Sequence, residues 1–197
     1  MRDERELIHR AGQGDQEAFR QLVETYQAPA YRLALRMCGG DAALAEDAAQ
    51  EAFLAVWRGL PRFRGDSRFS TWLYRLTTNA AIDCLRREKR HRDADDLDGV
   101  ELPDGGDTPQ EAAERTETQT AVRSALSALS DEHRQVLLLR YMQELDYGEI
   151  AVALGISEGT VKSRINRAKA RLKELLSGGG NLSAVISVKT AGEEGQK

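Results

Sequence analysis

The sequence predicts an all-α protein made of two small helical domains joined by a flexible acidic linker. Apolar residues recur at spacings of three and four along residues 3–90 and again after residue 117, which is the period of helices that bury one face. Between these stretches, residues 93–114 carry nine acids and no base. Hydrophobic residues are 41% of the 197 residues, which suffices for small helical cores rather than one large core.

Helices are expected from the start of the first domain, residues 1–92. A break at Gly12 and Gly14 separates two apolar stripes, and Asp15 is a suitable N-cap for the second of them. Pro29 is expected near the start of a further helix that ends at Gly39-Gly40, because proline is tolerated in a first turn and disrupts a helix interior.

The next helix is expected from its N-cap, Asp41, to about Arg58. One face carries an alanine-rich core stripe that includes Phe53 and Trp57. The opposite face is polar, with one leucine, and consists of Glu46, Asp47, Gln50, Glu51 and Leu54. Such a face is either solvated or the contact surface of a partner, since a charged rim around an apolar contact suits a reversible interface.

A basic and aromatic stretch follows, from Arg62 to Arg92. Nine of its residues are Lys or Arg and three are acidic, although the net charge of the chain is −4. Ser67 or Ser70 is expected to cap a helix that runs to about Arg90. The mixture suits single-stranded nucleic acid, because bases stack on aromatic rings and cations neutralise phosphates. A core helix with a solvated basic face is the alternative.

One face of this helix carries polar residues at spacings of three and four: Arg75, Asn79, Asp83 and Arg86. A planar amide can pair with a base edge, and Arg can hold a phosphate. For Asn79 and Asp83 the alternative is hydrogen bonding on the helix surface without a ligand.

Residues 93–117 form the predicted linker, whose acids, prolines and glycines cannot bury apolar surface. The helical pattern returns in the second domain, residues 118–177. Ser130 is expected to cap a helix through Leu145, and Asp146 and Glu149 have the spacing of a capping box. Gly155 then ends one helix and Ser157 caps the next. This order of helix, short turn and helix is the helix-turn-helix plan.

The last helix, from Glu158 to about Leu175, has the composition of a recognition helix. Residues 157–173 carry six bases and one acid, and the N-terminal residues of a recognition helix reach base edges. We assign four residues to bases, namely Lys162, Ser163, Asn166 and Arg167, and three to phosphates, namely Thr160, Arg164 and Lys169. A three-helix bundle that binds no DNA is the alternative.

Three segments resemble the extracytoplasmic-function (group 4) sigma factors of bacterial RNA polymerase. The pattern F-R-G-D-S-x-F-x-T-W-L-Y-R-x-x-x-N-x-x-x-D-x-x-R resembles their promoter-melting segment. The run A-E-D-A-A-Q-E-A-F-L-A-V-W is similar to the segment that binds the clamp helices of the polymerase, and residues 147–172 resemble the domain that reads the −35 element. The resemblance fails in the linker and in the tail.

The resemblance implies a sigma factor that binds core RNA polymerase and needs no cofactor. It would read the −35 element as duplex DNA and the −10 element as a single strand. The −10 residues would be Arg62, Arg64, Ser67, Trp72, Arg75, Asn79, Asp83 and Arg86. The polymerase-binding residues would be Asp47, Gln50, Glu51 and Leu54. An anti-sigma factor is expected as a further partner.

The remaining features indicate a protein without metal or membrane sites. Cys38 and Cys84 belong to no C-x-x-C or Cys/His cluster and are expected as small buried hydrophobes. No apolar run has the length of a membrane span, and no signal peptide is evident, so a cytoplasmic protein without membrane insertion is expected. Residues 178–197 follow a glycine run and are expected to form a flexible tail.

Two other functions compete with the sigma factor. A conventional helix-turn-helix regulator would bind duplex DNA as a dimer and use the first 90 residues as a sensor, which leaves the basic, aromatic loop of residues 62–67 unexplained. An enzyme finds no support, because the sequence has three histidines and shows no Ser/His/Asp order, H-E-x-x-H or glycine-rich phosphate loop.

Overall fold

The computed structural model describes residues 4–95 and 112–178. Within these ranges the chain forms eight α-helices, one short 3-10 helix and no strand, which confirms the all-α prediction. The elements are α1 (Glu4–Gly12), α2 (Gln16–Met37), α3 (Ala42–Gly59), η1 (Leu60–Arg62), α4 (Phe69–Asp95), α5 (Ala112–Ser127), α6 (Asp131–Tyr141), α7 (Tyr147–Leu154) and α8 (Glu158–Gly178). Residues 96–111 of the predicted linker and residues 179–197 of the predicted tail lie outside the described residues, and Gly178 is the last residue of α8.

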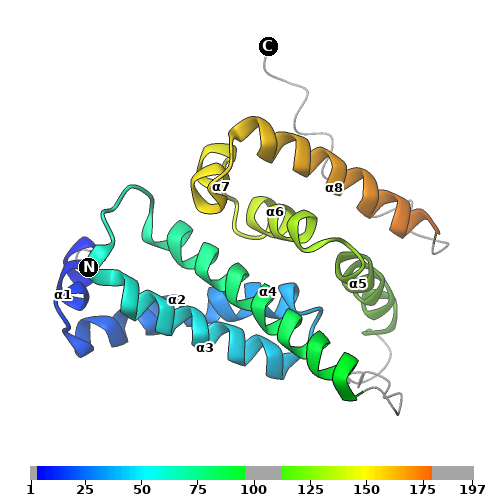
Figure 1. The fold of residues 1–197 in the computed structure, drawn as a ribbon. Coiled ribbons are helices and arrows are strands. Elements are labelled where there is room, and N and C mark those ends of the chain that lie inside the picture. The colour runs from blue at the N-terminus through cyan, green and yellow to red at the C-terminus, as the bar shows by residue number, and fades with distance from the viewer. Residues whose placement is uncertain (1–3, 96–111, 179–197) are drawn as a thin grey trace.

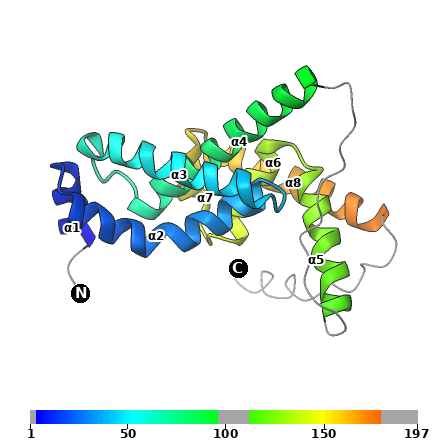
Figure 2. The same cartoon turned by 90° about the horizontal axis from the view of Figure 1, so that it is seen from below.

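The helices form an N-terminal bundle, α1–α4, and a C-terminal bundle, α5–α8. In the first, α2 and α3 make a hairpin through Gly39 and Gly40, whose φ angles of 70° and 99° suit glycine. Figure 1 shows α4 between this hairpin and the C-terminal bundle, in agreement with its contacts to α2, α3, α6 and α7. In the view of Figure 2, α5 stands at the end of the molecule away from α1.

Local capping signals place the first helices as the sequence predicts. The Asp15 carboxylate accepts from the N–H groups of Glu17 and Ala18, and Asp41 accepts from Leu44. The helices then bury one face each, and the fully buried side chains of this bundle include Leu22, Leu33, Met37, Val56 and Leu73. Both cysteines are buried as predicted, with 6% exposure for Cys38 and 3% for Cys84.

The prediction of a helix start near Pro29 is wrong. Pro29 lies inside α2, which runs unbroken from Gln16 to Met37. A proline there removes one backbone hydrogen bond, yet buried Ala30 and Leu33 follow directly after it. Packing of this face against the core therefore outweighs the tendency of proline to break a helix interior.

The ends of α4 and α5 also differ from the prediction. The predicted serine caps of α4 are absent. The amide of Trp72 donates to the carbonyl of Arg68, so the helix begins after Arg68. The Ser67 hydroxyl donates to the carbonyl of Arg68 and does not accept from an amide of the first turn. At its other end α4 continues to Asp95, and α5 begins at Ala112. Helices therefore enter both ends of the predicted linker, because the flanking residues include strong helix formers such as Ala112 and Ala113.

The C-terminal bundle follows its local signals closely. Ser130 caps α6, and the reciprocal capping box of Asp146 and Glu149 starts α7. Gly155 ends α7 with a φ of 65°, and the hydroxyl of Ser157 accepts from the amide of Thr160 to cap α8. One boundary differs, because α6 ends at Tyr141 rather than at Leu145.

Candidate nucleic-acid and partner interfaces

α8 presents a basic face to solvent. Its buried side is formed by Val161, Ile165 and Ala168, which pack against the rest of the bundle. This packing turns a second set of residues outward, and the exposed members of the predicted duplex-reading set are Lys162, Asn166, Arg167 and Lys169. The ammonium of Lys169 lies 5.9 Å from the ring centroid of Tyr141, a second exposed side chain that the sequence analysis did not select.

The other three residues of this predicted set are half-buried and already have partners. The Ser163 hydroxyl donates to the carbonyl of Thr160 at 3.0 Å, and the Thr160 hydroxyl lies 2.8 Å from that of Ser157. Arg164 forms an ion pair with Glu132 at 3.2 Å. These contacts help to hold the first turns of α8 in place, and the most exposed donors of the face belong to the other four residues.

The polar face of α4 is also open to solvent. Asn79, Asp83 and Arg86 are exposed along it, and Arg75 is half-buried. In the loop before the helix, Arg62 and Arg64 are exposed, whereas Ser67 is half-buried. All of the predicted single-strand residues of this loop and of α4 except Trp72 thus have polar side chains that are exposed or half-buried.

Trp72 lies in an aromatic cluster rather than on the open edge. Its ring stacks on Phe63 with centroids 4.7 Å apart and meets Phe69 at 6.0 Å. Gly59 approaches it so closely that a Cβ there would lie 2.8 Å from Trp72 Cζ2. One ring face is thus occupied by Phe63, and the cluster fixes the loop of Arg62 and Arg64 against α4.

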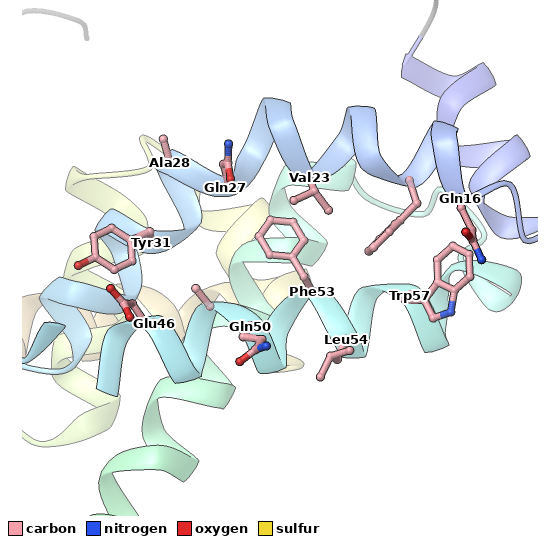
Figure 3. Close-up of a pocket in the computed structure, with 12 residues that line it drawn as sticks. Gln16, Val23, Gln27, Ala28, Tyr31, Glu46, Gln50, Phe53, Leu54 and Trp57 are labelled. Atoms are coloured by element: carbon pink, nitrogen blue, oxygen red, sulfur yellow. The ribbon is translucent and has the colours of Figure 1, made fainter. Parts of the chain in front are cut away.

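A groove of about 820 Å³ runs between α2 and α3. Figure 3 shows Phe53 pointing from α3 toward Val23 of α2, with Gln50 and Leu54 on the outer side of α3. The walls are mostly apolar and consist of Gln16, Phe19, Val23, Gln27, Ala28, Tyr31, Glu46, Ala49, Gln50, Phe53, Leu54 and Trp57. Leu54 is 47% exposed, so the groove offers apolar surface to a partner.

The predicted polymerase-binding residues divide at this groove. Gln50 and Leu54 line it, whereas Asp47 and Glu51 do not. Glu51 instead accepts a hydrogen bond from Arg87 of α4 at 2.5 Å, and this bond and one to Cys84 raise the pKa of the Arg87 guanidinium. The sequence analysis did not predict the α2 side of the groove. A signal was present, because Phe19 and Val23 make the apolar stripe of α2 wider than one buried face requires.

Family comparisons match both bundles. The sigma-70 region 2 model matches residues 22–91, and the sigma-70 region 4 model matches residues 119–172. The chain is 36% identical over 177 residues to the ECF RNA polymerase sigma factor SigW of Bacillus subtilis (strain 168), an alignment that covers 86% of this chain and 94% of SigW. The chain belongs to the extracytoplasmic-function sigma factors of bacterial RNA polymerase.

A further relative and two solved structures are also similar to this chain. This sigma factor is 36% identical over 172 residues to the ECF RNA polymerase sigma-E factor of Escherichia coli (strain K12), covering 83% of this chain and 88% of the relative. It is similar to CnrH in complex with the cytosolic domain of CnrY, with a TM-score of 0.65, 28% identity and coverage of 89% and 97% of the two chains. The sigma factor RpoE of Bartonella quintana, in complex with the anti-sigma factor NepR, gives a TM-score of 0.63, 26% identity and coverage of 81% and 96%.

The described residues of this sigma factor contain neither a metal cluster nor a membrane helix. In residues 4–95 and 112–178, no three His, Cys, Asp or Glu side chains gather in a way that could hold a metal ion. No helix in the described part of the chain is long and apolar enough to cross a membrane. Its family comprises transcription regulators rather than a known class of enzyme.

Proposed function

We propose that this sigma factor uses α8 to read the −35 duplex, the edge of η1 and α4 to hold the single-stranded −10 element, and the α2–α3 groove to bind core polymerase. One observation supports the proposal: the exposed polar residues form two separate sets, one on α4 and the loop before it and one on α8, and each set falls within one of the matched regions. Residues 1–92 would then bind polymerase and melt DNA, and residues 118–177 would read the −35 element, with 93–117 as linker and 178–197 as tail.

The electrostatics of the two DNA surfaces suit their different substrates. On α8, Lys162 and Asn166 lie about one turn apart on the same side of the helix, and the exposed Arg167 follows Asn166, so charged and amide donors can enter one groove together. On α4 the amide of Asn79 is flanked by Arg75 and Arg86, which suits a base held between two phosphates. Binding of extruded bases offsets the unstacking cost of about a few kcal/mol.

An anti-sigma factor is a further partner that we infer. The two solved structures described above are complexes, one of CnrH with the cytosolic domain of CnrY and one of the sigma factor RpoE with the anti-sigma factor NepR. The groove supplies the apolar surface that such a protein partner needs, and Leu54 lies on its exposed rim. Because polymerase works on chromosomal DNA, we place the activity of this chain in the cytoplasm.

Run-off transcription tests the whole proposal. Core polymerase with sheared genomic DNA of the source bacterium as template should give discrete transcripts only when this sigma factor is added, and sequencing them identifies a promoter. On that promoter, Arg167→Ala should weaken −35 duplex binding by about 1–3 kcal/mol if the contact is a bidentate one to guanine. Arg171→Ala is the control, since Arg171 pairs with Glu174 farther along α8 and should bind as wild type.

Asn79→Ala should separate melting from duplex recognition. We expect normal binding to a −35 duplex in a gel shift and reduced permanganate reactivity of thymines at the start site, because the base contact is lost. A pre-melted template should rescue the variant only partly. Promoter opening equal to wild type would show that Asn79 is not part of the base pocket and would point to the loop at residues 64–67 instead.

Substitutions at the groove test the polymerase surface. Leu54→Asp should weaken binding to core polymerase, because it places a carboxylate on the apolar rim of the groove. Val152→Asp is the matched control: Val152 is 54% exposed, like Leu54 at 47%, but lies on α7 in the other bundle. Equal loss of binding in both variants, or none in either, would reject the groove as the polymerase site.

A further inference from the structure

An exposed tyrosine lies beside the basic face of α8. Tyr141 is the last residue of α6 and is 52% exposed. α6 packs along α8 in the C-terminal bundle (Figure 1), and the ring of Tyr141 reaches Lys169 of α8, whose ammonium lies 5.9 Å from the ring centroid. The tyrosine therefore borders the surface that we propose for the −35 duplex, although no sequence pattern places it there.

Lys169 shares one face of α8 with residues that we assign to bases. Lys162, Asn166 and Lys169 follow one another at spacings of four and three, and all three are exposed, so they lie on one side of the helix. Lys169 lies about 10 Å beyond Lys162 along the helix axis. The major groove is about 12 Å wide, and a recognition helix enters it with its N-terminal residues. Lys169 therefore lies where the helix leaves the groove and meets the phosphates.

The charge of Lys169 is available to a phosphate. Two other cations of α8, Arg164 and Arg171, form ion pairs with glutamates. In the described part of the chain Lys169 has no acidic partner at ion-pair distance, and its ammonium lies over the Tyr141 ring instead. An aromatic ring attracts a cation through its quadrupole and carries no charge that would neutralise it. Lys169 can therefore keep its contact with the ring while it binds an anion on its other side.

We propose that Tyr141 is a positioning residue for the −35 duplex, and that its ring holds the Lys169 ammonium toward a phosphate at the edge of the major groove. This inference rests on the proposed reading of that duplex by α8. A free lysine side chain loses rotamer entropy when its ammonium is fixed at a phosphate. The ring restricts Lys169 before DNA binds, so less entropy is lost on binding and the affinity is higher.

Fluorescence anisotropy of the full chain with the −35 duplex of the identified promoter tests the role of the ring. Tyr141→Leu should weaken binding by about 2- to 5-fold, the effect of one exposed cation–π contact. Tyr141→Phe keeps the ring and should bind as wild type. Val152→Ala, at a position of α7 with a similar exposure of 54%, is the control and should also bind as wild type. Wild-type binding by Tyr141→Leu, or equal weakening by Tyr141→Phe, would overturn positioning by the ring.

A double-mutant cycle tests whether Tyr141 acts through Lys169. Lys169→Met removes the charge and keeps an unbranched side chain, and it should lower the slope of log affinity against log salt by about 0.9, the effect of one phosphate. Arg171→Ala should leave the slope unchanged, because Arg171 pairs with Glu174. In the Lys169→Met background, Tyr141→Leu should weaken binding no further. A further loss in that background, or an unchanged slope in Lys169→Met, would contradict the proposal.

Arg167→Ala separates a failure of this inference from a failure of the proposed function. If α8 reads the −35 duplex, Arg167→Ala weakens binding whether or not Tyr141 positions Lys169. Weakened binding by Arg167→Ala together with wild-type binding by Tyr141→Leu would overturn only the role of the ring. Normal binding by Arg167→Ala and by Lys169→Met would reject the reading by α8, and the inference about Tyr141 with it.

Discussion

At the scale of single residues, Trp72 shows how a side chain selected for ligand binding also has a structural role. Its ring stacks on Phe63 and meets Phe69, and Gly59 packs against it with no room for a methyl group. A loss of function on truncating the half-buried Trp72 would therefore mix lost contact with lost stability, since removing a packed tryptophan can cost several kcal/mol. Asn79 is exposed and is the cleaner probe of the DNA edge.

Gly59→Ala should disturb this cluster. Its φ of −90° suits any residue, so the cost comes from the close approach to Trp72, about 1–3 kcal/mol for overpacking. Urea unfolding followed by tryptophan fluorescence measures it. Gly159→Ala is the control, because a Cβ there lies at an ordinary 3.8 Å from Ser157 and should be neutral or slightly stabilising. Unchanged stability and emission in Gly59→Ala would show that Trp72 can shift to accommodate a methyl group without cost.

The two cysteines should resist thiol reagents in the folded protein. Burial raises the pKa of the Cys38 thiol from 9.0 to about 12 and also raises that of Cys84, and only the thiolate reacts. At pH 8 we expect slow reaction with a disulfide reagent in buffer and rapid reaction of both thiols in urea. Thr25→Cys supplies an exposed thiol as the control, and equal rates for native and introduced thiols would contradict the burial.

The raised pKa of Cys38 also determines how the free energy of unfolding changes at alkaline pH. Well below pH 9 the Cys38 thiol is mostly neutral in both the folded and the unfolded chain. As the pH rises from about 9 toward 12, the unfolded chain loses its proton first, so the free energy of unfolding decreases. Cys38→Ala should reduce the Cys38 part of this alkaline loss.

At the scale of elements, α2 forms as one helix despite an interior proline. Its buried side includes Leu22, Ala30 and Leu33, on both sides of Pro29, and the same helix supplies Phe19 and Val23 to the groove. A break at Pro29 would separate these residues and open both the core and the groove. The element therefore exists because of its packing, although its local sequence favours a break.

Pro29→Ala should stabilise the protein. The new amide can donate to the carbonyl of Thr25, and alanine is favoured over proline inside a helix by up to about 3 kcal/mol. The free energy of unfolding, measured in urea, should rise. Gln27→Ala, at an exposed position of the same helix, is the control and should change it by less than about 0.5 kcal/mol. A fall in stability would mean that the proline bends α2 as the core requires.

At the scale of the whole molecule, Arg134 connects segments that are 97 residues apart in the chain. Three of its four carbonyl acceptors lie in its own bundle and one lies in the other. The residue thus contributes first to the C-terminal bundle and second to the joint between the bundles.

Arg134→Lys should weaken the two bundles unequally. Lysine has fewer donors than the guanidinium and cannot meet all four carbonyls, so the C-terminal bundle should lose about 1.5–3 kcal/mol. Both tryptophans lie in the N-terminal bundle, at positions 57 and 72, so fluorescence reports that bundle, while circular dichroism reports all helices. We expect the dichroism midpoint in urea to fall more than the fluorescence midpoint.

The control for this comparison is Arg164→Lys. Its ion pair with Glu132 is partly exposed, and such pairs contribute little to stability. Equal shifts of both midpoints in Arg134→Lys would show that the bundles unfold as one unit.

The sequence by itself determined the features that depend on neighbours a few residues away. Asp15, Asp41, Ser130 and the Asp146–Glu149 box cap their helices as predicted, because a cap needs only an amide two or three residues ahead. The helix-turn-helix follows from Gly155 and Ser157 for the same reason. The family was likewise evident from short motifs, whereas the roles of the individual site residues stay predictions.

Only the tertiary structure decided the features that depend on distant contacts. The continuity of α2 through Pro29, the groove between α2 and α3, the pairing of Glu51 with Arg87 and the reach of Arg134 to Met37 all join residues whose proximity no local pattern encodes. Burial stabilises α2 and outweighs the local preference against an interior proline, and a buried acceptor on another helix holds Arg134. The Glu51–Arg87 pair is partly exposed and contributes little to stability. Propensity therefore predicted where most helices begin, and packing decided where they continue and what they face.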